Sequence, residues 1–69
     1  MSLHPQSILI NRYMFSERDA YSWVFDHGYY PLKEHTTDHY YRFRLSEPNP
    51  RARYVTKEIT PGIKFILST

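Results

Sequence analysis

The sequence predicts an α+β fold, in which one helix packs on one face of a small, mainly antiparallel sheet. Residues 38–45 alternate aromatic and basic side chains with the period of two that is typical of a strand. Residues 17–27 place apolar side chains at helical spacing, and the remaining apolar runs are short and bounded by turn residues. The expected order is therefore one strand, one helix and then four strands, arranged as two layers.

The length and composition predict one domain over residues 1–69, with an ordered core over 6–67. The 69 residues include no cysteine, so no disulfide or thiolate metal site can support the core. Seven Tyr, four Phe and one Trp can supply the burial instead. No apolar run is long enough for a membrane helix, and no secretory signal pattern is present, so we expect an intracellular protein without a membrane partner.

The first strand and the helix have local signals. Residues 7–11 are an apolar run rich in β-branched side chains, which predicts a buried strand. Ser16 is placed to cap the helix, and Gly28 to end it in the left-handed conformation. The stripe expected to face the sheet has i, i+3, i+4, i+7 spacing and consists of Ala20, Trp23, Val24 and His27.

Two hairpins are expected after the helix. Residues 32–36 and 39–45 form the first, with its turn at Thr37 and Asp38. Residues 54–59 and 63–67 form the second, whose turn uses the fixed φ of Pro61 and the positive φ available to Gly62.

The strand over residues 39–45 is predicted to have two unlike faces. Tyr41, Phe43 and Leu45 form a core face, whereas Tyr40, Arg42 and Arg44 point the other way. The chain is also basic in its second half: residues 1–38 carry three cations against five carboxylates, and residues 39–69 carry six against two. The predicted binding residues are Tyr40, Arg42, Arg44, Arg51, Arg53, Lys57 and Lys64, where the two lysines join if strand register allows it.

Such a face fits two kinds of partner. Exposed aromatic rings can stack unpaired bases and arginines can pair with phosphates, which favours single-stranded nucleic acid. The uncovered face or an unpaired edge strand can equally dock another protein or a second copy of the chain. The sequence leaves nucleic acid, a protein partner and a homo-oligomer open.

No motif predicts an enzyme, a cofactor or a metal site. There is no Gly-x-Ser-x-Gly elbow, and two glycines cannot form a phosphate-cradling loop. The alternative is a small metal-independent nuclease, in which His39 acts with Asp38 and Glu34 while an arginine holds the phosphate. His35 and His39 beside these carboxylates are also candidate metal ligands, but the turn expected between them separates them.

Three segments together resemble a small domain of unknown function found in proteins of tailed phages and large DNA viruses. They are Ala20-x-x-Trp23-Val24-x-x-His27-Gly28-Tyr29, then Tyr40-Tyr41-Arg42-Phe43-Arg44, then Thr56-Lys57-x-x-x-Pro61-Gly62-Ile63-Lys64. The resemblance covers residues 6–67 and consists of core and turn residues. It implies a viral or prophage protein, located in the host cytoplasm or in the virion, and it implies no mechanism.

Overall fold

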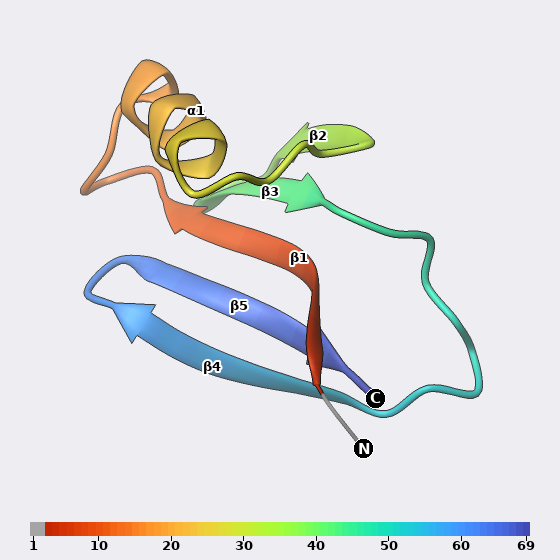
Figure 1. The fold of residues 1–69 in the computed structure, drawn as a ribbon. Helices are drawn as coiled ribbons and strands as arrows, with labels where there is room; N and C mark the ends of the chain where they lie inside the picture. Colours follow the sequence, from red (N-terminus) through yellow and green to blue (C-terminus); the bar gives the residue numbers. More distant parts are fainter. Residues whose placement is uncertain (1–2) are drawn as a thin grey trace.

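Five strands and one helix make up the fold in the computed structural model, which describes residues 3–69 (Figure 1). The elements are β1 (His4–Asn11), α1 (Glu17–Asp26), β2 (Lys33–Thr36), β3 (Tyr40–Arg44), β4 (Tyr54–Thr60) and β5 (Ile63–Ser68). They form one sheet in the order β2-β3-β1-β5-β4, with every neighbouring pair antiparallel. The predicted α+β class and the order of the elements are confirmed.

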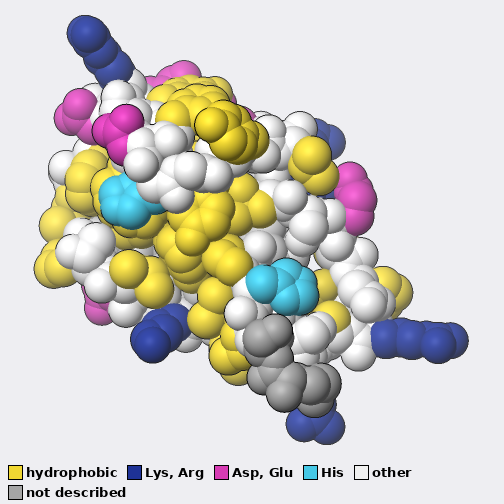
Figure 2. Space-filling model, viewed as in Figure 1, with side chains coloured by type: hydrophobic (Ala, Val, Ile, Leu, Met, Phe, Trp, Pro, Cys, Tyr) yellow, Lys and Arg dark blue, Asp and Glu magenta, His cyan; other side chains and the backbone are white. Residues whose placement is uncertain are grey.

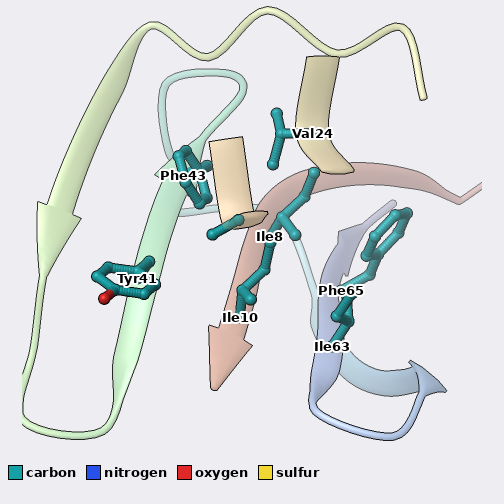
Figure 3. Close-up of a cluster of buried hydrophobic side chains, with 8 residues drawn as sticks. Ile8, Ile10, Val24, Tyr41, Phe43, Ile63 and Phe65 are labelled. Atoms are coloured by element: carbon teal, nitrogen blue, oxygen red, sulfur yellow. The ribbon is translucent and has the colours of Figure 1, made fainter. Parts of the chain in front are cut away.

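The central strand β1 supplies the middle of the core. Ile8 lies opposite Phe43 of β3 and Phe65 of β5, and Ile10 lies opposite Tyr41 and Ile63. Because directly opposed residues share a face, these side chains form one apolar surface under α1 (Figure 3). Ile8, Ile10, Phe43 and Ile63 are fully buried, so the alternation predicted for β3 is confirmed.

The helix begins as the sequence predicts, but it ends one residue earlier and buries only part of the predicted stripe. Ser16 caps it, since its hydroxyl accepts a hydrogen bond from the Asp19 amide at 3.1 Å. Ala20 and Val24 are fully buried against the sheet, and Trp23 is only partly buried. The expectation that His27 faces the sheet is wrong, because His27 is the exposed C-cap. Its Nδ1 donates to the Trp23 carbonyl at 2.7 Å, and its ring stacks on the Trp23 ring at 3.8 Å.

One helix leaves much of the sheet uncovered. All seven residues of the edge strand β4 are exposed. On the side seen in Figure 2, a band of hydrophobic side chains runs down from the helix, and Lys and Arg side chains lie mostly at the rim. The helix among residues 3–69 is not long and apolar enough to cross a membrane.

Two register shifts interrupt the sheet, and both lie in strands paired with β5. In β1 the shift falls between Pro5 and Ser7, where Gln6 is the extra residue. A proline near the start of a central strand is tolerated at such a bulge. In β4 the shift falls between Glu58 and Thr60, where Ile59 is the extra residue. The side chains of β4 before Ile59 are therefore on the face opposite to that of an unbroken hairpin.

Both glycines have positive φ, as predicted: 82° at Gly28 and 87° at Gly62. Their surroundings differ. A Cβ at Gly62 would lie 2.9 Å from both Met14 Sδ and Phe15 Cε2, whereas a Cβ at Gly28 would meet nothing within 4 Å. The segment between β1 and α1 therefore packs directly against the Pro61–Gly62 turn.

The more completely an aromatic side chain is buried, the more its removal should lower the free energy of unfolding. Phe43→Ala should lower the free energy of unfolding by about 3–5 kcal/mol, because it removes a fully buried ring from the middle of the core. Trp23→Ala should lower it by less, because Trp23 is only partly buried. Urea titrations of both variants check this order, and a larger loss for Trp23→Ala would contradict the placement of α1.

The two glycines form a matched pair for substitution. Gly28→Ala and Gly62→Ala each force a left-handed residue, which costs about 1–2 kcal/mol. Gly62→Ala should melt at a clearly lower temperature than Gly28→Ala, because its methyl group also collides with Met14 and Phe15. Adding Met14→Ala should recover part of this difference in thermal melts. Equal melting temperatures for the two glycine variants would show that the contact is unimportant.

Candidate functional site

The face of the sheet that α1 does not cover carries the cationic residues of β2, β3 and β5. Strand register places two rows of side chains across it. One row is Lys33, Arg44, Ser7, Ile66 and Thr56, and the other is His35, Arg42, Leu9, Lys64 and Glu58. Tyr40 and Asn11 form a further pair beside the second row. We call this set of residues the open face.

A hollow of about 160 Å³ lies on the β2–β3 side of the open face. It is lined by Lys33 and His35 of β2 and by Arg42 and Arg44 of β3, and we call it the basic hollow. Its position follows from the hairpin turn, because Thr37 donates from its amide to the Tyr40 carbonyl at 2.8 Å. Arg12 Nη1 supports the same turn by donating to the Thr37 carbonyl at 2.6 Å.

The two arginines of the hollow are weakly engaged by the protein itself. Arg44 lies 3.9 Å from Glu47, the only ion pair found within residues 3–69, and the Glu47 side chain is 79 % exposed. An exposed pair of this kind contributes only about 0–1 kcal/mol. The Arg42 Nε is buried and has no hydrogen-bond partner within residues 3–69. Because a guanidinium carries five N–H donors and Arg44–Glu47 is the one ion pair in this part of the chain, the outer N–H groups of both arginines remain for an external acceptor.

Tyr40 lies on the open face but its ring is already in use. The Lys64 ammonium sits 5.6 Å from the Tyr40 ring centroid, and Lys64 Nζ donates to the Tyr40 hydroxyl at 3.2 Å. A base that stacked on this ring would compete with the cation–π contact. The arrangement presents positive charge more readily than an open aromatic platform.

Of the residues predicted for the site, strand register brings together Tyr40, Arg42, Arg44 and Lys64. Lys57 lies on the opposite face, because it pairs with Phe65. The bulge at Ile59 causes this. Without it, the Pro61–Gly62 turn would have placed Lys57 opposite Ile66 on the open face. The same shift places Glu58 opposite Lys64, so negative charge balances the β4 side of the face.

Arg51 and Arg53 lie in the connection between β3 and β4, not in a strand. Both are exposed, and the Arg53 backbone pairs with Thr69 at the end of the chain. The connection passes the end of the sheet where β1 begins and β5 ends (Figure 1). These two arginines extend the positive charge beyond the sheet itself.

A buried polar pair fixes where this connection leaves the sheet. Ser7 Oγ donates to Gln6 Oε1 at 2.6 Å, and Gln6 Nε2 donates to the Ser46 carbonyl at 2.9 Å. Both side chains are buried, so each bond satisfies a group that water cannot reach. The β1 bulge that creates this pair therefore also positions the residues that follow Arg44.

The groups required by the nuclease hypothesis do not share a face. Glu34 pairs with Phe43 on the helix-covered side, away from Arg42 and Arg44. His39 is exposed before β3, and its ring lies 5.8 Å from the Tyr13 ring. Within residues 3–69, no group of three or more His, Asp or Glu side chains is arranged to hold a metal ion.

Sequence reasoning missed two members of the basic hollow, Lys33 and His35. The segment from Lys33 to Thr36 has few β-prone residues, so its register is hard to assign from the sequence. A signal was nevertheless present. Counting back through the Thr37–Tyr40 turn places Lys33 and His35 opposite Arg44 and Arg42.

No family model matches this chain, and no curated protein or solved structure matches it either.

One acid next to α1 has a shifted pKa. Burial raises the pKa of Glu34 above its usual 4.5, and the nearby Glu17 carboxylate raises it further. The folded state therefore holds the Glu34 proton more tightly than the unfolded chain does. This group stabilises the fold at pH values below 4.5, and the contribution is lost as the pH rises through the folded pKa.

Glu34→Gln should therefore raise the melting temperature slightly at neutral pH. The glutamine is uncharged, so it avoids the desolvation and the repulsion from Glu17 that disfavour the Glu34 carboxylate. The gain should shrink as the pH falls below 4.5, where the wild-type carboxyl is also protonated. Thermal melts at a series of pH values measure the difference. A gain that stays constant across the series would contradict the shifted pKa.

Proposed function

We propose that this domain binds single-stranded nucleic acid through the open face, without catalysing a reaction. The phosphates would contact Arg42, Arg44 and Lys64, with Arg51 and Arg53 adding charge at the end of the sheet. The observation that carries this proposal is the concentration of cations from three strands on one uncovered face, with a single weak ion pair among them. Free guanidinium and ammonium groups on one surface suit a polyanion.

The structure favours phosphate contacts over base stacking as the main source of affinity. The Tyr40 ring already lies under Lys64, while Arg42 and Arg44 retain donors. Binding of this kind is largely independent of sequence and weakens steeply with salt. The resemblance to a phage and large-virus domain suggests the setting, which we propose to be viral or prophage, in the host cytoplasm or in the virion.

A protein partner, including a second copy of the chain, is the alternative. β4 is a long edge strand: it pairs with β5 on one side, and its other side has no neighbouring strand among residues 3–69. It exposes Tyr54, Val55 and Ile59. Such an edge can pair with another strand. The bulge at Ile59 and the charges of Lys57 and Glu58 interrupt it, as in edges that resist pairing. We therefore place nucleic acid first.

Fluorescence anisotropy with a labelled oligothymidine tests the proposal. Wild-type binding should appear at low salt at about 10⁻⁴–10⁻⁶ M, and log K should fall by about 0.7 per neutralised phosphate for each unit of log salt. Arg42→Gln with Arg44→Gln should weaken binding about tenfold or more at low salt and flatten this slope, because two phosphate contacts are lost. The melting temperature should not fall, because the two arginines share one ion pair among residues 3–69, Arg44 with Glu47, and such a pair contributes only about 0–1 kcal/mol.

Lys57→Gln is the control for charge alone, because it removes one positive charge, against two for the arginine pair, from the opposite face. It should leave the affinity within about twofold of wild type, as expected for a charge outside the interface. A loss in log K for Lys57→Gln that is half the loss for the arginine pair would show that only net charge matters. No binding at high micromolar protein and low salt, together with a concentration-dependent dimer by sedimentation, would replace nucleic acid by self-association.

A further inference from the structure

The basic hollow is a more specific feature than a charged surface, because its four side chains are fixed as two cross-strand pairs. Lys33 lies directly opposite Arg44, and His35 lies directly opposite Arg42. Side chains in such pairs have Cβ atoms about 4.5–5.5 Å apart, so all four project from one small patch of the hairpin. They are the residues that line the hollow.

This arrangement works against the stability of the free protein. Lys33 and Arg44 are like charges directly opposite each other, which destabilises an antiparallel pair, and no carboxylate among residues 3–69 lines the hollow. The Arg42 Nε adds a buried donor with no hydrogen-bond partner among residues 3–69. An unmatched donor in a buried position carries a desolvation penalty, which adds to the cost of this arrangement in the free protein. The three observations together indicate that the hollow is built to receive an anion.

The number of cations points to the charge of that anion. A phosphodiester within a strand carries one negative charge and two non-bridging oxygens. A phosphomonoester carries about −1.5 to −2 at neutral pH and offers three acceptor oxygens. The hollow offers two guanidinium groups that can bind side by side, one ammonium and one imidazole. These are more donors than the two free oxygens of a diester can accept, and they suit the monoester.

The rest of the open face fits the remainder of the same ligand. Lys64 is two strands away from Arg42, with Leu9 between them, which is about 9–10 Å at the usual strand spacing. The Lys64 ammonium is held beside Tyr40 and does not line the hollow, so it is placed to contact a later phosphate along the strand. A strand that begins in the hollow would therefore run from β2 across β1 towards β5.

We propose that the basic hollow binds the terminal phosphomonoester of a nucleic-acid strand, so that the domain prefers phosphorylated strand ends. This inference rests on the proposed function. It adds that one end of the strand is recognised, and that Lys33 and His35 are the residues responsible for the preference.

Anisotropy competition with three versions of one oligothymidine tests this: a 5′-phosphate, a 3′-phosphate and hydroxyls at both ends. At least one phosphorylated version should compete several-fold better than the hydroxyl version. Lys33→Gln and His35→Gln should each bring this ratio close to one. Lys64→Gln should weaken all three versions and leave the ratio unchanged, which separates the hollow from the rest of the face.

Thermal melts serve as the control for folding. Lys33→Gln should be at least as stable as wild type, because it removes a like-charge pair. Equal affinity for all three versions would overturn the end preference and leave the proposed function standing. Chemical-shift changes of His35 with inorganic phosphate, but no binding of any oligonucleotide, would overturn both the end preference and the proposed function. That result would indicate a phosphorylated protein as the ligand instead.

Discussion

The whole molecule depends on the fact that a ten-residue helix can cover only one face of a five-stranded sheet. Ala20 and Val24 bury the apolar surface formed by β1, β3 and β5, and they do so around Ile8 and Phe43. The second face has no such cover, so its side chains must be compatible with water. Polar and charged side chains with long apolar stems meet that condition. The site proposed for the ligand is thus a direct result of the two-layer architecture.

Compatibility with water does not explain how the charges are arranged. A solvated face is most stable when opposite charges alternate across strands, as Lys64 and Glu58 do on the β4 side. On the β2–β3 side the two cations Lys33 and Arg44 lie opposite each other, and no carboxylate among residues 3–69 lines the hollow that they form with His35 and Arg42. The same sheet therefore shows both arrangements, and the unfavourable one is confined to the hollow.

Local chemistry made much of the fold predictable. Ser16 acts through a hydrogen bond to a nearby backbone amide, and Gly28 and Gly62 act through their own backbone conformation. The alternation around Phe43 identifies the core face without knowledge of any other strand. The predictions for Lys57 and His27 failed because they depend on geometry that is set beyond the residue itself. The face of Lys57 is decided by one extra residue at Ile59, and a bulge leaves no clear mark in the sequence. His27 was misplaced because one residue at the helix end decides between burial and capping.

Protection of an exposed strand edge is another reason for a protein to place cations near β2. Charged residues on an edge discourage pairing with other chains, and β2 is an edge strand. That explanation can account for Lys33 and His35, but not for Arg42 and Arg44. Those two lie on β3, which is hydrogen-bonded to strands on both sides and has no free edge to protect. The interior position of the two arginines, with Lys33 directly opposite Arg44, therefore favours a bound anion as the reason for this cluster.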